Sequence, residues 1–452
     1  MKRVRIASGA GFAGDRIEPA LEIIRQNAAD YIIFECLAER TIALAQKCRM
    51  KNSELGYNAL LDYRMEKVIP LLKEHPVRII TNMGAANPKN AAKHIYEIAV
   101  RNGLEKLKIA VVEGDDVLNI LEQFSKAEIM ETGKPLDSLK GRIVSANAYI
   151  GGQGISKALE AGADIVVTGR VADPSLTTGA LMYAFGKSYD DFDFIGKTVV
   201  AGHLLECGAQ VTGGYYADPG KKDVPDLWRV GFPIINFDET GDFVISKLPE
   251  SGGCVTEATV KEQLLYEIQD PSQYITPDVV ADFSEIRVQE IGKDTVSVTG
   301  AAGRSETQTY KVSVGYEDGY IGTGEISYGG INCVARAELT AEILEKRFEE
   351  ISNRILEKRI DIIGINSLYK DALKQSLSEP VEVRVRLAVR TETESDAKEA
   401  GREVEALYTN GPAGGGGARS SVTHIISIAS ILIDKRYVHT EVFLEGEKYE
   451  VI

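Results

Sequence analysis

Six short apolar runs in the first half of the chain, separated by segments of helical spacing, constrain the fold more than any other feature. The runs occupy residues 4–8, 31–35, 77–82, 108–113, 142–147 and 164–169. The segments between them repeat apolar residues with a helical period, as in residues 17–27, 90–102 and 155–161. Short apolar strands that alternate with helices are typical of a parallel sheet with helices on both faces. We therefore predict an α/β domain over residues 1–230.

The pattern changes after residue 230. Residues 231–330 read as short strands between turn signals, which predicts a β-rich region with one helix near residues 260–269. Residues 331–452 combine a long amphipathic helix at residues 335–358 with strands and a glycine-rich loop, which predicts an α+β domain. The predicted fold class is thus α/β: an N-terminal mostly parallel sheet with helices on both faces, then a β-rich region, then a C-terminal α+β layer. A chain of 452 residues fits two or three domains.

Composition excludes several classes of partner. Asp and Glu number 67 against 52 Lys and Arg, a net charge of −15. Nucleic acids and anionic membranes attract basic surfaces, so we expect neither as a partner. No apolar stretch reaches the roughly 20 residues that span a bilayer, and the N-terminus lacks the apolar core of a signal peptide. The five cysteines are scattered without a C-x-x-C pair, so we expect a cytoplasmic protein without a disulfide framework or a structural zinc site.

Small and polar residues stand at the carboxyl ends of the predicted strands. Ligands of parallel sheets bind at these ends. We predict that a substrate pocket lies where the ends of the first, third, fifth and sixth strands converge, with Asn82 and Arg170 in it. Arg170 offers a planar fork for a carboxylate or a phosphate. Gly84 and Asn147 are further candidate substrate contacts, and Asn82 and Asn147 can donate hydrogen bonds to a carbonyl or thioester oxygen.

A complete dinucleotide-binding fingerprint, Gly9-Ala-Gly-Phe-Ala-Gly14, follows the first strand. Its glycines would let a pyrophosphate approach the next helix, and Glu35 would hold a ribose hydroxyl. Asp15 argues against this role, because its carboxylate would cap the same N–H groups and repel phosphates. The alternative is a capped turn that needs glycine for its backbone angles. We predict that NAD does not bind tightly. The candidate substrate contacts in this turn are Gly9, Gly11, Asp15 and Arg16.

A second glycine-rich loop, Gly411-Pro-Ala-Gly-Gly-Gly-Gly417, lies near the end of the chain. Consecutive glycines can aim backbone N–H groups at one anion. No Lys follows the glycines, so the loop is not an ATP-binding P-loop. The alternative is a flexible connector, which the adjacent arginine disfavours. The candidate anion contacts are Gly414, Gly415, Gly416, Gly417 and Arg419.

His203 and Glu206 are three residues apart and share one face of a predicted helix. An imidazole beside a carboxylate suits general acid–base catalysis near neutral pH. The alternative is a surface ion pair, which the glycine-rich flanks disfavour. Asp173 is the third candidate catalytic group, although it could simply pair with Arg170 and cap a helix. Two ligands are too few to assert a metal, so we predict no metal site and no firm cofactor beyond the CoA moiety of a substrate.

Five long motifs are more distinctive than any single residue. They are Ser8-Gly-Ala-Gly-Phe-Ala-Gly-Asp-Arg16, Gly169-Arg-Val-Ala-Asp-Pro174, Gly202-His-Leu-Leu-Glu-Cys-Gly-Ala-Gln-Val-Thr-Gly-Gly214, Asp218-Pro-Gly220 and the loop from Gly411 to Gly417. They resemble the acyclic terpene utilisation protein A family over nearly the whole chain. Genes of that family occur with those of acyl-CoA carboxylases in the breakdown of citronellol and geraniol. Many relatives carry a further small domain, so we expect that domain to be absent here or supplied by a separate small subunit.

Together, the candidate residues and the resemblance imply a catabolic enzyme that acts on a carboxylic acid or an acyl-CoA thioester. The first hypothesis is hydratase, dehydratase or other lyase chemistry, because acid–base groups and anion-binding groups are what such a step requires. One alternative is a non-catalytic subunit that binds an acyl-CoA or scaffolds a partner enzyme. A second alternative is an NAD-dependent oxidoreductase. We also expect a homo-oligomer.

Overall fold

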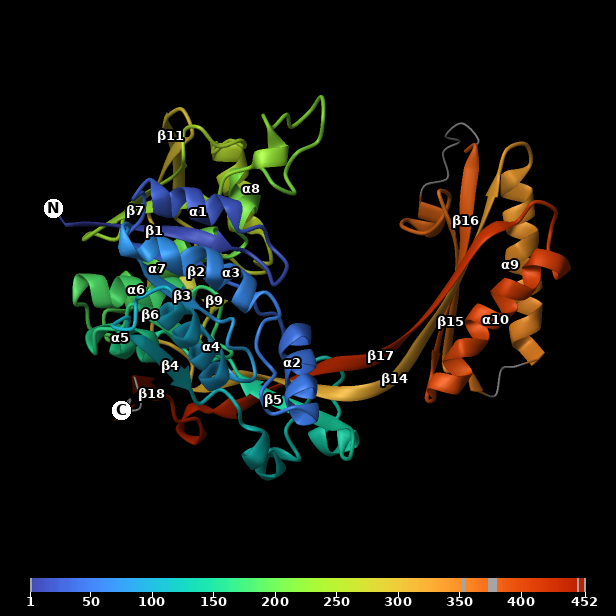
Figure 1. Cartoon of the computed structure of the whole chain (residues 1–452), viewed down its shortest axis with the longest axis horizontal. Coiled ribbons are helices and arrows are strands. Elements are labelled where there is room, and N and C mark those ends of the chain that lie inside the picture. The colour runs from blue at the N-terminus through green and yellow to red at the C-terminus, as the bar shows by residue number, and fades with distance from the viewer. Residues whose placement is uncertain (1, 351–353, 373–379, 445–446, 451–452) are drawn as a thin grey trace. The chain divides into compact units, whose positions relative to one another are not determined.

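The computed structural model describes residues 2–350, 354–372, 380–444 and 447–450. The chain divides into two compact units (Figure 1). Unit 1 comprises Met1–Gly315 and Ile428–Ile452, and unit 2 comprises Tyr316–Ser427. Two long strands, β14 (Thr309–Gly329) and β17 (Gly416–Asp434), have residues in both units.

A parallel sheet forms the centre of unit 1. Its strands run in the spatial order β1, β2, β3, β6 and β4. Their bounds are Arg3–Ala10, Tyr31–Phe34, Arg78–Thr81, Ile165–Thr168 and Ile109–Glu113. Neighbours in this order pair in parallel, and every residue of β2 and of β6 is buried. Strands buried on both faces need cover on both, which explains their continuous apolar character. The predicted α/β fold class is confirmed.

Antiparallel strands extend this sheet at both edges. On the β1 side the order continues with β7 (Pro233–Asp238), β8 (Phe243–Lys247), β12 (Thr295–Thr299) and β11 (Arg287–Gly292). On the β4 side it continues with β18 (Glu441–Leu444) and β19 (Glu447–Glu450). A small separate sheet holds β9 (Tyr274–Ile275), β10 (Val280–Asp282) and β13 (Ala302–Arg304).

The fifth predicted strand forms but does not join the parallel sheet. This strand, β5 (Ile143–Ala148), pairs with β14 instead. The chain then returns through α5 to β6, which inserts between β3 and β4.

The helices of unit 1 form two groups, each packed against the parallel sheet. One group holds α1 (Glu18–Arg25), α3 (Leu61–Val68) and α4 (Pro88–Arg101). The other holds α5 (Gln153–Glu160), α6 (Ser175–Phe185) and α7 (Phe192–Glu206). The order of the strands explains this division. Right-handed crossovers put helices on opposite faces when the chain reverses its direction across the sheet, as it does after β4.

Two further helices complete unit 1. Helix α2 (Glu39–Lys51) packs against β5, and α8 (Glu257–Leu265) packs against α7. Every residue of α7 from Thr198 to Glu206 is buried, so the part of the helix that carries His203 and Glu206 has no solvated face.

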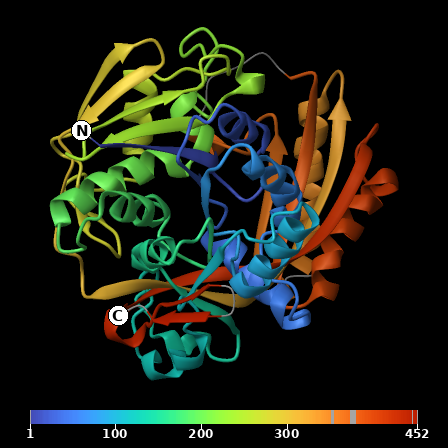
Figure 2. The same cartoon turned by 60° about the vertical axis from the view of Figure 1, so that its left-hand side comes forward.

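Unit 2 is a sheet covered on one face by two helices (Figure 2). Its strands run in the order β15 (Glu357–Ile363), β16 (Glu382–Thr391), β14 and β17. Alternate residues of β16 are buried against α9 (Cys333–Glu350) and α10 (Glu394–Asn410), which gives unit 2 its own apolar core. Of the helix predicted at residues 335–358, residues 351–353 lie outside the described part, and β15 already begins at Glu357.

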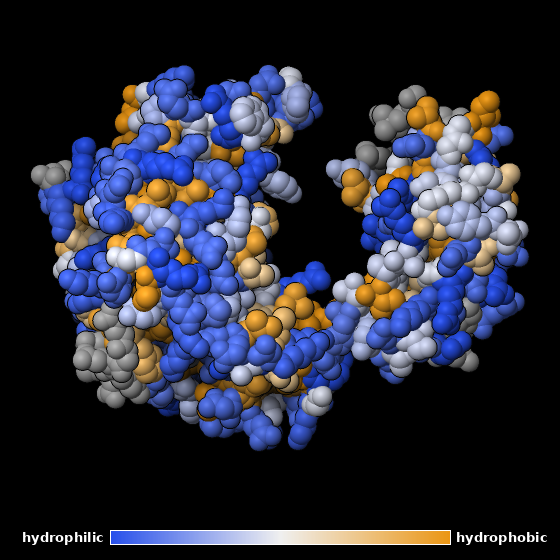
Figure 3. Space-filling model, viewed as in Figure 1, coloured by the Kyte–Doolittle hydropathy of each residue, from blue (hydrophilic) through white to orange (hydrophobic). Residues whose placement is uncertain are grey.

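The surface agrees with the composition. The visible face of each unit is predominantly hydrophilic, with scattered apolar side chains (Figure 3). Among the described residues, no helix is both long and apolar enough to cross a bilayer.

Candidate functional site

A cavity of about 840 Å³ opens in unit 1 at the carboxyl ends of the parallel strands. Its wall includes the turns that follow β1, β2 and β6, together with the C-terminal end of α7. Ligands of open α/β sheets occupy this position. The side chains that line it and carry chemistry are Glu35, Glu39, Tyr149, Asp173, Glu206, Cys207, Glu267 and Lys311.

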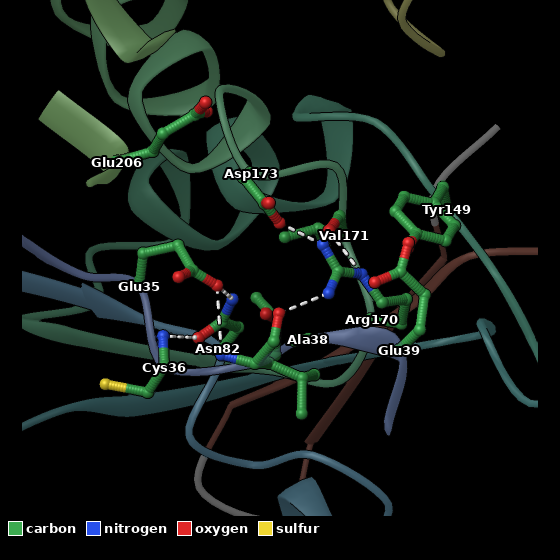
Figure 4. Close-up of polar contacts among 12 residues, drawn as sticks. Glu35, Cys36, Ala38, Glu39, Asn82, Tyr149, Arg170, Val171, Asp173 and Glu206 are labelled. Carbon is green, nitrogen blue, oxygen red and sulfur yellow. Dashed lines mark hydrogen bonds and ion pairs between the residues drawn. The ribbon is translucent and has the colours of Figure 1, made fainter. Parts of the chain in front are cut away.

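Three of these carboxyls, on Glu35, Asp173 and Glu206, line the cavity, and Figure 4 shows their side chains. Each comes from a different part of the sequence: the end of β2, the turn before α6, and the last turn of α7. In each carboxyl, one oxygen is bound by the surrounding protein and the other has no hydrogen-bond partner among the described residues. Each of the three carboxyls that line the cavity therefore keeps one oxygen without a protein partner, and that of Glu206 is buried.

Asp173 pairs with Arg170. The Arg170 guanidinium contacts Oδ1 of Asp173 and the carbonyl oxygen of Leu37, and its Nε donates to the carbonyl of Val171 at 2.9 Å. It also stacks on the ring of Tyr149, 4.3 Å from the centroid. Only 1% of the Arg170 side chain is exposed, against 39% of that of Asp173. Arg170 thus acts on the cavity through Asp173 and not by direct contact.

Glu206 is bound to His203, and the imidazole is engaged at both nitrogens. Nδ1 of His203 lies 2.9 Å from Oε1 of Glu206, and Nε2 lies 2.9 Å from the backbone carbonyl oxygen of Gln263. A carbonyl oxygen only accepts, so Nε2 carries a proton, and one further proton lies between Nδ1 and Glu206. The ring is 1% exposed and packs against Tyr274 and Phe283. Glu206 lines the cavity and His203 does not, and Oε2 of Glu206 is buried with no hydrogen-bond partner among the described residues.

Glu35 is held by a fixed amide. Its Oε1 accepts from the backbone N–H of Leu37 at 2.9 Å and from Nδ2 of Asn82 at 2.8 Å. The orientation of Asn82 is set from its other end, because its Oδ1 accepts from the N–H of Cys36 at 2.7 Å. Asn82 is fully buried and does not line the cavity. It positions Glu35.

The protein environment raises the proton affinity of all three carboxyls. Burial raises the pKa of Glu35 well above its usual range, and the charge of Asp173 adds to this effect. Burial raises the pKa of Glu206 to about 7, although His203 counteracts it. Burial also raises the pKa of Asp173, against the lowering effect of Arg170. Of the three, Asp173 is the one that contacts an arginine, so it ionises with the most support from a neighbouring charge.

A second polar group, formed by Glu39, Tyr149 and Lys311, lines the same cavity. The hydroxyl of Tyr149 donates to Oε1 of Glu39 at 2.5 Å, and Nζ of Lys311 lies 3.3 Å from the same oxygen. Burial acts to raise the pKa of Glu39, but the Tyr149 hydrogen bond and the charges of Lys311 and Arg170 outweigh it and lower this pKa to about 2. Glu39 therefore stays ionised at neutral pH.

The dinucleotide fingerprint is used for packing within the chain. Oδ2 of Asp15 accepts from the N–H of Gly11 at 2.8 Å. A Cβ on Gly11 would lie 2.3 Å from the carbonyl carbon of Cys207, so the turn presses directly on the end of α7. A Cβ on Gly9 would collide with Phe34 of β2. Of the four candidates in this turn, only Gly11 lines the cavity, whereas Arg16 donates to the carbonyl of Trp228 at 2.7 Å.

The remaining candidates lie elsewhere. Asn147 donates to Oδ2 of buried Asp115 at 2.8 Å, and a Cβ on Gly84 would meet the carbonyl oxygen of Thr168 at 2.5 Å. The glycine-rich loop belongs to unit 2. There the backbone of Gly414 and of Gly417 has positive φ, and Arg336 donates to the carbonyl of Ala413 at 2.7 Å. Gly415, Gly416 and Arg419 also belong to unit 2.

Sequence analysis assigned no acid–base role to Glu35, Glu39, Tyr149 or Lys311. Glu35 carried a usable signal, since it stands directly after the apolar strand β2. Glu39 and Lys311 are 272 residues apart, and no local pattern connects them. In the described part of the chain, no group of three or more His, Cys, Asp or Glu side chains has a geometry that could hold a metal ion.

The fold and the cavity define an α/β protein with an acid-lined pocket at the carboxyl ends of its parallel strands. The chain belongs to the acyclic terpene utilisation family, whose family model, described as acyclic terpene utilisation family protein AtuA, matches residues 4–444. This match confirms the resemblance seen in the motifs. Comparisons with curated proteins and with solved structures found no match.

Proposed function

We propose that the chain is a catabolic enzyme that catalyses a hydration, a dehydration or a related lyase step on an organic acid or its CoA thioester. The observation that carries the proposal is the set of three carboxyls on one cavity, each with one oxygen that has no hydrogen-bond partner among the described residues. An elimination of water needs a base for a C–H proton and an acid for the leaving hydroxyl. Carboxyls in different electrostatic surroundings divide these roles.

In this proposal Asp173 is the base and Glu206 is the acid. The Arg170 charge favours the ionised form of Asp173. Burial raises the pKa of Glu206 to about 7, which favours its protonated form. In the dehydration direction, Asp173 takes the proton from carbon, and Glu206 gives a proton from Oε2 to the hydroxyl group while its Oε1 stays hydrogen-bonded to Nδ1 of His203. The C–H and C–O bonds break, the carbon–carbon double bond forms and water leaves. Hydration is the reverse.

His203 is a positioning residue in this scheme. Its imidazole holds Oε1 of Glu206 at 2.9 Å, and the Gln263 carbonyl fixes which ring nitrogen faces the carboxyl. Replacing Glu206 by Gln removes the transferable proton, so turnover should fall roughly 10²–10⁴-fold. Replacing His203 by Gln leaves the carboxyl in place, so it should chiefly shift the pH–rate profile of turnover.

The experiment is a panel of CoA esters incubated with the protein in D₂O, with deuterium at the α-carbon measured by mass spectrometry. Exchange is expected with wild-type protein and is expected to be lost in Asp173→Asn. Glu66→Gln is the matched control, because Glu66 is an exposed carboxyl that pairs with Arg101. Saturable binding of an ester without exchange or turnover would instead support a non-catalytic acyl-CoA-binding subunit.

A further inference from the structure

Glu35 differs from the other two carboxyls because its contacts suit a neutral acid. The groups that bind its Oε1 are an N–H of the backbone and the neutral amide of Asn82. Arg170 is the cation that acts electrostatically on Glu35, but its guanidinium is bound to Asp173 and to two backbone carbonyls. Glu35 is 7% exposed, and burying a carboxylate without a paired cation is costly. Because Oε1 of Glu35 already accepts two hydrogen bonds, the proton of the neutral acid lies on Oε2.

The charges that line the cavity disfavour an anion. Five acidic side chains line it, namely Glu35, Glu39, Asp173, Glu206 and Glu267, and Glu39 and Asp173 are anionic even when Glu35 and Glu206 are protonated. Lys311 is the basic side chain among the lining residues, and it already contacts Glu39 at 3.3 Å. Bringing a free carboxylate among these groups would add repulsion that no uncommitted cation relieves. An uncharged carbonyl meets no such repulsion and accepts a hydrogen bond.

We propose that Glu35 binds the substrate as a neutral carboxylic acid, with Oε2–H donating to a carbonyl oxygen, and that the part of the substrate held in the cavity is an uncharged β-hydroxycarbonyl group, as in a thioester. This inference rests on the proposed function, because it assigns the third carboxyl of the same site. The hydroxyl end faces Glu206, and the carbon between hydroxyl and carbonyl faces Asp173. When Asp173 removes the proton from that carbon, negative charge develops on the carbonyl oxygen. The hydrogen bond from Glu35 stabilises this charge while the proton stays on Glu35.

The same Glu→Gln change should therefore have opposite effects at two positions. At residue 35 the amide of Gln is neutral, still accepts from Leu37 and Asn82, and still donates to the substrate. Glu35→Gln is expected to keep turnover within about tenfold of wild type, whereas Glu35→Ala is expected to lose roughly 10²–10³-fold. At residue 206 the change removes the transferred proton, so the turnover of Glu206→Gln is expected to fall as far as that of Glu35→Ala. Circular dichroism of each variant checks that it is folded.

Substrate charge is tested with the N-acetylcysteamine thioesters of 3-hydroxy acids of increasing chain length, each compared with its free acid. Calorimetry is expected to show saturable binding of a thioester to wild type and to Glu35→Gln, with binding of the free acid at least tenfold weaker. A free acid that binds as tightly as its thioester would overturn the inference, as would a panel in which no thioester binds. Equal losses in Glu35→Gln and Glu35→Ala would show that Glu35 acts as a carboxylate and would also overturn it.

These outcomes are separable from failure of the proposed function. A thioester that binds through Glu35 but shows neither exchange of its α-proton nor gain or loss of water would leave the inference on binding standing and would refute the lyase chemistry. Exchange of the α-proton that proceeds equally well with free acids would refute the inference on binding and would leave the lyase chemistry standing.

Discussion

At the scale of single residues, burial decides what the acid–base groups can do. His203 and Glu206 have the spacing of an ordinary surface pair on a helix, yet α7 is enclosed, and both imidazole nitrogens contact protein atoms. An imidazole held in this way does not reach a ligand. It holds a proton beside Glu206, which lines the cavity and whose buried Oε2 has no hydrogen-bond partner in the described part of the chain.

The pH dependence of stability should report this shared proton. Burial raises the pKa of Glu206 to about 7, and the partner carboxylate raises that of His203 although burial opposes it. The folded pair therefore holds its proton to higher pH than the unfolded chain does. Between about pH 5 and 8 the folded state binds more protons, so the free energy of unfolding should fall as pH rises. In Glu206→Gln this slope should flatten, by an amount on the order of 1–3 kcal/mol across the range.

Urea denaturation at a series of pH values measures this slope. Glu160→Gln, an exposed carboxyl near Lys157, serves as the control and should keep the wild-type slope. A Glu206→Gln variant with an unchanged slope would mean that the pair does not titrate in this range.

At the scale of elements, the turn after β1 serves the end of α7. The Gly11 backbone lies so close to Cys207 and Gly208 that no Cβ fits between them. The turn thereby fixes the position of Glu206, one residue before Cys207. The glycine pattern that resembles a dinucleotide site is thus explained by contact between two backbone segments.

Gly11→Ala should displace the end of α7. The added Cβ would lie 2.3 Å from a backbone carbon, so the chain must shift, at a cost of about 1–3 kcal/mol in stability. Gly14→Ala is the matched control, since its Cβ would meet the exposed side chain of Phe12 at 3.0 Å. Thermal unfolding should separate the two variants. Equal melting temperatures would contradict the proposed contact.

Tight binding of NAD is not expected at this turn. Asp15 already accepts the N–H of Gly11, and the backbone of α7 takes up the space in front of it. Calorimetry with NAD and NADH should show no binding in the micromolar range. Asp15→Ala should not create such binding, because the contact with Cys207 remains. A micromolar dissociation constant for wild type would refute this prediction.

At the scale of the whole molecule, each unit has a core of its own. The core of unit 2 comes from β14, β15, β16, α9 and α10, while the cavity is lined entirely by residues of unit 1. The chain passes between the units only through β14 and β17. Lys435 donates to Gln308 at 2.9 Å, and Ser427 donates to Asp318 at 2.8 Å, so these strands run side by side in opposite directions.

Unit 1 should therefore fold without unit 2. Replacing residues 316–427 by Asn-Gly would join the two strands through a tight hairpin turn. This variant is expected to unfold cooperatively in urea and to keep the pH slope that Glu206 produces. Loss of cooperative unfolding would show that unit 1 depends on the core of unit 2.

The parallel centre of the fold could be predicted from local periodicity, because the spacing of apolar residues reflects which faces of each strand are buried. Runs such as Tyr31–Phe34 and Ile165–Thr168 are apolar throughout since both faces of these strands are covered. The sequence also indicated Asp173, Glu206 and the strand ends as places for chemistry, since small and polar residues stand there. The pairing of β5 with β14 could not be predicted from the sequence, because the apolar pattern of a strand does not indicate which strand it pairs with.

The use of each candidate side chain depends on contacts between distant parts of the chain. Arg170 contacts Leu37, 133 residues away, and Glu39 contacts Lys311, 272 residues away. Whether a guanidinium is free to bind a ligand, or a carboxyl keeps its proton, depends on such distant neighbours and on the exclusion of water. The spacing of residues along the chain predicts neither the availability of the guanidinium nor the protonation of the carboxyl. The neutral role inferred for Glu35 follows from the same cause: Asn82, Leu37 and Asp173 surround it only once three strand ends have met.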